Sequence, residues 1–139
     1  MSDVKHRVSL QSPTVEEYCL LREKTTWGKV DSAQVLISLN NSLFHVVIHE
    51  NEKIIGMARV VGDGALYFYI QDVVVDPEYQ NRGLGTILMH EVENYLSSSA
   101  KKGSTIGLLS AKGKEKFYFH FGYKNRPSEN LGNGMCKFV

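Results

Sequence analysis

Short stretches of alternating or continuous apolar residues, separated by polar turns, predict β-strands in the first half of the chain. We expect these strands at residues 5–10, 44–48, 54–61 and 66–75. A polar turn at residues 50–52 joins the second and third strands as a hairpin, and the glycine-rich turn at 62–64 reverses the chain again. Three antiparallel strands in succession therefore lead up to residue 75.

Two helices are predicted before the hairpin. Thr14 followed by Glu17 forms a capping box, and the helix that it opens should end near residues 25–28. Asp31 followed by Gln34 signals a second, short amphipathic helix that stops at residues 40–41. Both helices carry an apolar stripe, so each should pack one face against the sheet.

A longer helical pattern begins after Gly83, with apolar residues at helical spacing as far as Leu96. The short apolar stretch 105–109 then reads as a strand, so a strand–helix–strand crossover with two parallel strands is expected. A last helix is predicted at about 112–121, with Gly122 at its C-terminal end. The tail, residues 134–139, is expected to form a final edge strand.

Antiparallel strands followed by one crossover predict an α/β (α+β) fold. We expect a mixed, mostly antiparallel central sheet of six or seven strands with helices on both faces. The chain has 139 residues, the size of about one domain, and no stretch resembles a linker. The sequence therefore predicts a single domain over residues 1–139.

Composition narrows the classes of function. Sixteen basic and 15 acidic residues give a formal charge of +1, so nothing favours binding to nucleic acid. No apolar run is long enough for a signal peptide or a membrane span, so no membrane partner is expected. Cys19 and Cys136 lack metal-ligand spacing and are predicted to be free thiols. We therefore expect a cytoplasmic protein without a metal site.

The stretch from Gln80 to Gly85 follows a strand directly and opens a helix. Unpaired N–H groups and the positive dipole end at a helix start bind anions, and Arg82 adds a side-chain donor. A P-loop would need Gly-Lys-Ser/Thr, which does not follow Gly85, and a dinucleotide loop would need a third glycine where Leu88 stands. The pattern alone predicts either a phosphate loop or a capped turn.

Two motifs carry a resemblance to a known family. Gln80-x-x-Gly83-x-Gly85, placed after an apolar strand, resembles the acetyl-CoA signature of the GCN5-related N-acetyltransferase (GNAT) family. The aromatic run before Gly122-Tyr123 resembles a later motif of that family, and the order of the predicted elements matches its fold along nearly the whole chain. The resemblance implies an N-acetyltransferase that uses acetyl-CoA as co-substrate.

The resemblance also implies roles for individual residues. The backbone of residues 73–75 would pair with the pantetheine arm, and the N–H groups of residues 81–86 would hold the pyrophosphate. The implied cofactor-binding residues are Val73, Val74, Val75, Gln80, Asn81, Arg82, Gly83, Leu84, Gly85 and Thr86. Tyr118 stands at the family's general-acid position, where its hydroxyl would protonate the leaving thiolate. The strands ending near Val75 and Leu109 would splay to form the cofactor slot.

Other interpretations stay open beside these roles. Tyr118 could instead be a core aromatic residue. Asp72 is the sequence candidate for the general base, with a hydrogen-bonded carboxylate inside the strand as its alternative; Gln71 should alternate to the opposite face. The candidate substrate-binding aromatics could equally be packing residues; they are Trp27, Tyr67 and Tyr69.

One position departs from the family pattern. Many members carry an asparagine that contacts CoA about seven residues before the tyrosine, and here that position is Ala111. Lys112 and Lys114 follow, and these could reach the phosphates of the cofactor or lie in solvent.

The resulting functional prediction is transfer of an acetyl group to a primary amine, on a small molecule, by direct attack in a ternary complex. The alternatives are a protein or peptide N-acetyltransferase and a non-catalytic acyl-CoA-binding module. An exposed final strand at residues 135–138 could also pair with a second copy as a homodimer.

Overall fold

The computed structural model describes residues 6–139, so Lys5 of the first predicted strand lies outside the described residues. This part of the chain divides into two compact units, one that ends at Gly107 and one that comprises Leu108–Val139. We describe each unit by itself. The prediction of a single domain stays a prediction.

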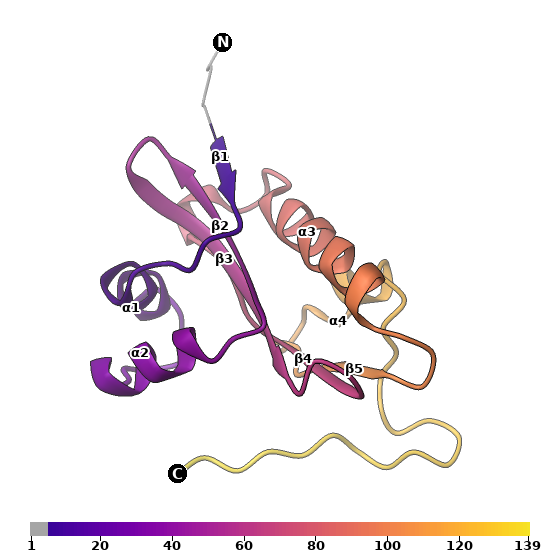
Figure 1. Cartoon of the computed structure of the whole chain (residues 1–139). Helices are drawn as coiled ribbons and strands as arrows, with labels where there is room; N and C mark the ends of the chain where they lie inside the picture. Colours follow the sequence, from indigo (N-terminus) through magenta and orange to yellow (C-terminus); the bar gives the residue numbers. More distant parts are fainter. Residues whose placement is uncertain (1–5) are drawn as a thin grey trace. The chain divides into compact units, whose positions relative to one another are not determined.

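The first unit contains a sheet and three α-helices (Figure 1). Its elements in chain order are β1 (His6–Ser9), α1 (Val15–Glu23), α2 (Ser32–Asn40), β2 (Phe44–Glu50), β3 (Lys53–Gly62), β4 (Tyr67–Val75), the 3-10 turn η1 (Pro77–Tyr79), α3 (Leu84–Ser99) and β5 (Thr105–Leu108). Only the last residue of β5 belongs to the second unit. The α+β class and the order of elements agree with the prediction.

The strands follow the order β1-β2-β3-β4-β5 in one mixed sheet, and the first four pair antiparallel. Within residues 6–139 the sheet has five strands, so the prediction of six or seven was wrong. The missing strand is the tail at 134–139, where Met135 and Phe138 are 88% and 93% exposed. Apolar side chains favour a strand only where a neighbouring strand can pair with its backbone, and no described residue pairs with this tail.

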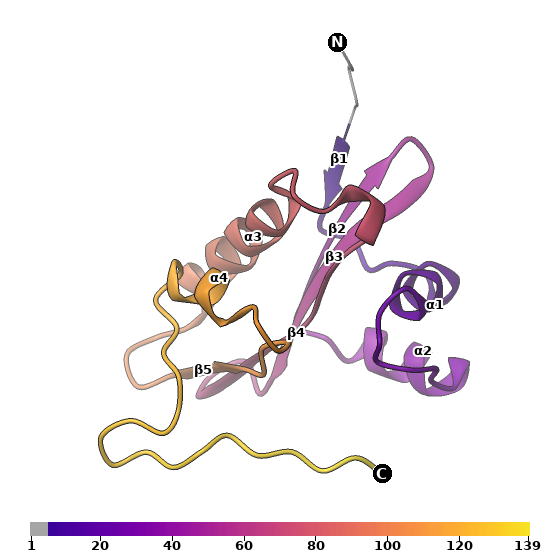
Figure 2. The same cartoon turned by 180° about the vertical axis from the view of Figure 1, so that it is seen from behind.

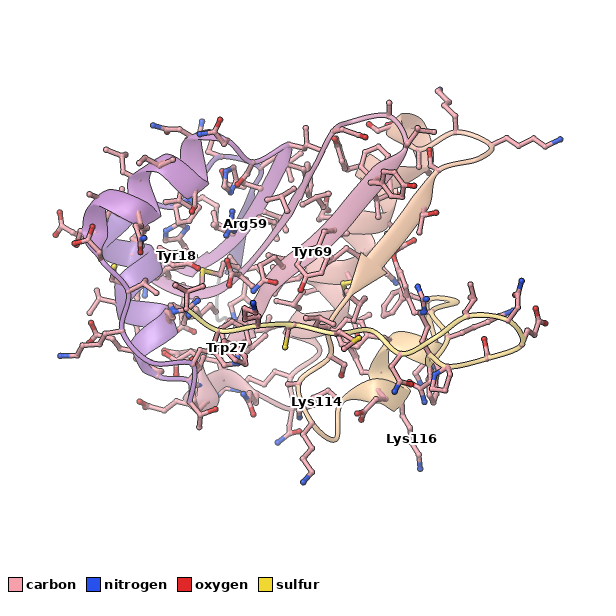
Figure 3. All side chains as sticks on the ribbon, turned by 90° about the horizontal axis from the view of Figure 1, so that it is seen from below. Tyr18, Trp27, Arg59, Tyr69, Lys114 and Lys116 are labelled. Atoms are coloured by element: carbon pink, nitrogen blue, oxygen red, sulfur yellow. The ribbon has the colours of Figure 1, made fainter. Side chains whose placement is uncertain are left out.

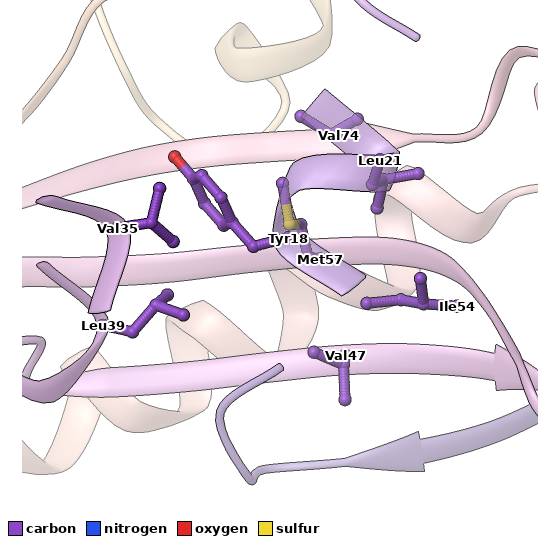
Figure 4. Packing of buried hydrophobic residues seen from close by; sticks show 8 residues of the cluster. All are labelled: Tyr18, Leu21, Val35, Leu39, Val47, Ile54, Met57 and Val74. Carbon is purple, nitrogen blue, oxygen red and sulfur yellow. The ribbon is translucent and has the colours of Figure 1, made fainter. Parts of the chain in front are cut away.

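Helices cover both faces of the sheet, as predicted: α1 and α2 lie on one face and α3 on the other (Figures 1 and 2). The core on the α1/α2 face is a cluster of eight buried residues (Figure 4): Tyr18, Leu21, Val35, Leu39, Val47, Ile54, Met57 and Val74. The opposite face buries one stripe of α3, formed by Leu84, Leu88, Met89, Val92 and Leu96. This second packing holds the start of α3 close to the sheet.

The caps of the two N-terminal helices are those expected from the sequence. Thr14 and Glu17 form the reciprocal capping box of α1, and the Asp31 carboxylate accepts from two backbone N–H groups at the start of α2. However, α1 ends at Glu23, before the predicted end. The Thr25 hydroxyl donates to the carbonyl of Arg22 at 2.6 Å and satisfies one of the last helical acceptors there.

The second unit contains one short helix, α4 (Glu115–Phe119). The predicted helix at 112–121 was too long at both ends. Gly113 has φ of +87°, outside the right-handed helical region, so the helix begins only after Lys114. Gly122, with φ of +90°, follows the helix as expected, and its N–H donates to the carbonyl of Phe119.

Among residues 6–139, no helix combines the length and apolar character needed to cross a bilayer. The same residues contain no group of three or more metal-ligating side chains placed to hold an ion.

Candidate functional site

The loop between β4 and α3 takes a shape that depends on left-handed backbone conformations. Asn81 and Gly83 have φ of +66° and +79°, and the Gln80 side chain donates from Nε2 to the carbonyl of Val75 at 3.2 Å. A Cβ added at Gly83 would meet no atom within 4 Å, so glycine is needed there for its backbone angle rather than for space. The loop thus turns the chain sharply from the end of the strand into the helix.

The start of α3 offers unpaired backbone donors. No side chain caps this end of the 16-residue helix, and the first helical hydrogen bond runs from the N–H of Ile87 to the carbonyl of Gly83, at 3.2 Å. The N–H groups of the residues before Ile87 therefore point out of the helix end, where the helix dipole is positive. Such an end binds an anion such as a phosphate.

Two cationic side chains lie against the ring of Tyr79, in the turn that precedes this helix. The guanidinium of Arg82 and the ammonium of Lys53 each lie 5.1 Å from the centre of the Tyr79 ring. The Tyr79 hydroxyl donates to Glu50 Oε2 at 2.7 Å, and this hydrogen bond is the main cause that raises the pKa of Tyr79. Tyr79 is thereby held in place, and it keeps Arg82 beside the loop that opens α3.

Asp76 anchors the end of β4, a role that sequence reasoning missed. Its side chain is fully buried, accepts from Lys24 Nζ and from the N–H of Glu78, and lies 3.8 Å from Lys53 Nζ. Burial acts to raise the pKa of Asp76, but these hydrogen bonds and charges outweigh it, so the pKa is lowered. The signal in the sequence was an aspartate directly before a proline at the end of a strand.

The last residues of β4 extend beyond its neighbour on one edge. The N–H of Thr105 donates to the carbonyl of Leu66 at 2.7 Å, which places the start of β5 beside the start of β4. β5 has four residues and β4 has nine, so β5 ends well before residue 73. The backbone of residues 73–75 therefore lies beyond the reach of this strand. The predicted separation of the strands that end near Val75 and Leu109 would involve residues of both units, and it stays a prediction.

Asp72 is buried, at 3% exposure, on the face of the sheet that carries α1 and α2. Its Oδ2 accepts from the Tyr18 hydroxyl at 2.8 Å and from Arg59 Nε at 2.7 Å, and its Oδ1 accepts from Gln71 Nε2 at 3.1 Å. A carboxylate that is already bonded to three donors is poorly placed to take a proton from a substrate amine. These contacts favour the alternative of a hydrogen-bonded carboxylate inside the strand.

Sequence reasoning missed the partners of Asp72. Tyr18 is a buried residue of α1, and the helical pattern in the sequence indicates no partner for its hydroxyl. Arg59 was the clearer signal, because it is the one charged residue in the apolar stretch 54–61. A half-buried arginine on one strand calls for an opposite charge, and the buried Asp72 on the neighbouring strand provides it.

The three candidate substrate-binding aromatics belong to the first unit. Tyr69 lies on the same face of the sheet as Tyr18 and Arg59, and Trp27 lies in the α1–α2 loop beside that face (Figure 3). The guanidinium of Arg22 lies 5.6 Å from the centre of the Trp27 ring, which is 38% exposed. Tyr67 is 63% exposed at the start of β4. Trp27 and Tyr67 are thus exposed enough to contact a ligand, and Tyr69 is half-buried.

Tyr118 lies in α4 of the second unit. Its ring contacts Phe117 and Tyr123 edge to face, with centroids 5.0 and 6.5 Å away. Burial raises the pKa of the Tyr118 hydroxyl, which keeps it protonated at neutral pH. Lys112 and Lys114 have exposed side chains, which fits both of the interpretations given above.

Comparison with known proteins agrees with this architecture. A family model described as the acetyltransferase (GNAT) domain matches residues 13–139. The chain is 29% identical over 117 residues to the uncharacterised N-acetyltransferase ycf52 of Pyropia yezoensis, covering 81% of this chain and 64% of that protein. It is 29% identical over 118 residues to a histone acetyltransferase of Glycine max, covering 77% and 50%. The chain therefore spans less than two thirds of the length of these curated relatives.

A solved structure gives the same result for the fold. A Staphylococcus aureus protein of unknown function, described as a probable acetyltransferase, superimposes with a TM-score of 0.89 at 29% identity, covering 97% of this chain and 100% of that chain. Since the family model spans nearly all of the sequence and the fold agrees, the chain belongs to the GNAT acetyltransferase family.

Proposed function

We propose that the protein is an acetyl-CoA-dependent N-acetyltransferase that moves an acetyl group to a primary amine of a small molecule. The observation that carries the proposal is the uncapped start of α3, which follows η1 and a left-handed turn at Asn81 and Gly83. Bound there, acetyl-CoA would supply an acetyl group already activated as a thioester. Family membership supports this co-substrate, because an acyl-CoA is the donor that the family implies.

The residues at this end of the first unit fit such a donor. The N–H groups at the start of α3 would bind the pyrophosphate, and Arg82 beside Tyr79 would add positive charge. The backbone of residues 73–75, which extends beyond β5, would pair with the pantetheine arm in the manner of an added strand. A main-chain N–H of this segment would stabilise negative charge on the thioester oxygen during attack.

Two protons must move during the transfer. Tyr118 is the proposed general acid, since its hydroxyl stays protonated and can donate to the departing thiolate. The amine must lose a proton, and Asp72 is bonded to other donors. We therefore assign the removal of this proton to a water chain that leads to solvent.

A second candidate function is acetylation of a protein or peptide. The relative from Glycine max, described as a histone acetyltransferase, favours it. The balanced charge of this chain favours the small acceptor, because a basic protein tail would call for an acidic surface. Pairing of residues 135–138 with a second copy also stays a proposal.

Titration with acetyl-CoA, followed by thiol release with a mixed panel of small amines, polyamines, aminoglycosides and peptides, tests the proposal. We expect saturable binding, a higher melting temperature and thiol release with small amines. Release with peptides alone would favour the second candidate. Binding without release by any amine would indicate an acyl-CoA-binding module, and the absence of binding would contradict the proposal.

A further inference from the structure

Asp72 is in a backbone conformation that is uncommon in a strand. Its φ is +57°, in the left-handed region, although it is not a glycine and lies inside β4. Across the sheet, Arg59 lies opposite Gln71 and Met57 lies opposite Val74. Ala58 therefore faces two residues of β4, which is a β-bulge at Asp72 and Val73.

The bulge changes which face of the sheet the side chains of β4 reach. Phe68 packs against Tyr95 of α3 at 6.4 Å, whereas Val74, six residues later, lies in the cluster on the α1/α2 face. Without the extra residue, two positions an even number apart would lie on one face. The prediction that Gln71 would point away from Asp72 was wrong for the same reason, since the two side chains are hydrogen bonded.

The side-chain contacts of Asp72 hold this bulge. A left-handed backbone at such a residue is strained, and it persists only where its surroundings impose it. Here the carboxylate accepts from Tyr18 of α1 and Arg59 of β3, and Arg22 Nη1 lies 3.7 Å from Oδ1. Because the carboxylate is buried, each of these partners is costly to lose.

The same contacts continue to the α1–α2 loop. Arg22 donates to the Tyr18 hydroxyl at 3.3 Å, to the carbonyl of Trp27 at 3.3 Å and to the carbonyl of Gly28 at 3.2 Å. Arg59 in turn donates to the carbonyl of Ser38 and to the hydroxyl of Ser42, at the end of α2. An unbroken set of contacts thus runs from the bulge in β4 to the loop that carries Trp27.

We infer that Asp72 is a positioning residue: through Tyr18 and Arg22 it couples the backbone of residues 73–75 to the α1–α2 loop. The inference rests on the proposed function, in which acetyl-CoA would bind to residues 73–75 and the acceptor amine would bind at the α1–α2 loop. The bulge sets the direction in which residues 73–75 leave the sheet, and Arg22 sets the position of Trp27. Residues 73–75 and the α1–α2 loop therefore become ordered together. In this role Asp72 does not act as the general base.

Amide hydrogen exchange of the ligand-free full chain tests the coupling, with the variants Asp72→Asn and Tyr18→Phe. Asparagine tolerates a left-handed backbone, and Tyr18→Phe removes only one oxygen, so both variants should fold. We expect exchange to become about tenfold faster at residues 73–75 and at 27–28 together. Amides of residues 46–48, in the centre of β2, should change little. The matched control Glu52→Gln removes an exposed carboxylate and should leave both segments unchanged.

Two further measurements, the affinity for acetyl-CoA and the pH dependence of activity, distinguish a positioning role of Asp72 from a catalytic one. In Asp72→Asn, the Kd for acetyl-CoA should rise about tenfold, and the pH profile of kcat/KM should keep its acidic limb. Loss of that limb would overturn the positioning role and make Asp72 the base. Unchanged exchange at either segment, or equal acceleration across the whole sheet, would overturn the coupling. If the parent protein binds no acetyl-CoA, the proposed function fails, while the exchange result still decides the coupling.

Discussion

The Tyr18 hydroxyl donates a 2.8 Å hydrogen bond to Asp72 Oδ2, although the two residues are 54 positions apart in the chain. Replacing Tyr18 by Phe keeps the buried ring but leaves a buried carboxylate with one donor fewer. We expect the free energy of unfolding to fall by about 1–3 kcal/mol, measured by urea denaturation at neutral pH. Tyr67→Phe is the control, since that side chain is 63% exposed and should change stability little. Equal effects of the two substitutions would show that the hydrogen bond contributes nothing.

The same pair predicts how stability changes at alkaline pH. Burial first, and then the charge and hydrogen bond of Asp72, raise the pKa of Tyr18 in the folded state. The unfolded chain therefore loses the tyrosine proton at a lower pH, near 10, than the folded protein does. The stability contribution is complete below that pH and is lost as the pH rises through the folded pKa. Denaturation between about pH 9 and 11 should show a steeper loss in the parent than in Tyr18→Phe.

The bulge at Asp72 is a feature of the fold that could not be predicted from the sequence. Strand β4 was predicted from its composition, and its side chains were assigned by simple alternation. Alternation holds only while consecutive residues keep extended angles, and a single left-handed residue reverses it. Aspartate is among the residues that tolerate this angle, but nothing in the local sequence requires it at Asp72. The partners that stabilise it, Tyr18 and Arg59, come from distant segments.

The glycine loop was more accessible to prediction because its signals are local. The helix start after Gly83 follows from neighbouring residues, and the structure contains it at Leu84. The tail at 134–139 was not predictable in the same way. Whether an apolar tail pairs with a sheet depends on a partner strand, and the tail's own residues do not encode one.

Lys24→Met tests the anchor at the end of β4. The ammonium of Lys24 is the closest cation to the buried Asp76 carboxylate, and without it we expect a loss of about 1–3 kcal/mol in the free energy of unfolding at pH 7. Asp76 has a lowered pKa in the folded state, so its contribution is present above about pH 4 and disappears as the pH falls through the folded value.

Removing Lys24 should raise that folded pKa, so the midpoint of acid unfolding should move to higher pH. Circular dichroism during an acid titration measures the shift. Lys29→Met is the matched control, because it removes an exposed lysine in the loop that follows α1. The same midpoint in both variants would mean that Lys53 alone compensates the charge of Asp76.

Gly83→Ala separates backbone strain from cofactor binding. Alanine would fit the space but not φ of +79°, so stability should fall by about 1–2 kcal/mol, and Gly83→Asn should recover part of it. Gly103→Ala is the control, because that glycine has φ of +98° with equal space but lies in the loop after α3. Both alanine variants should melt earlier by differential scanning calorimetry. The Kd for acetyl-CoA should rise only in Gly83→Ala. Equal affinities of Gly83→Ala and Gly103→Ala would show that the loop at Gly83 does not bind the cofactor.

Tyr118→Phe tests the proposed general acid. The ring contacts with Phe117 and Tyr123 do not need the hydroxyl, so the variant should fold and bind acetyl-CoA with an unchanged Kd. Without the proton donor, the thiolate would have to leave unprotonated, and kcat should fall by about 10²-fold or more, with the substrate that the thiol-release panel identifies. Burial raises the pKa of this hydroxyl, so the alkaline limb of the parent's kcat profile should lie above pH 10 and should be lost in the variant. A variant with full kcat would return Tyr118 to a packing role, whereas a fall in kcat together with a weaker Kd would indicate a disturbed cofactor site instead of a missing proton.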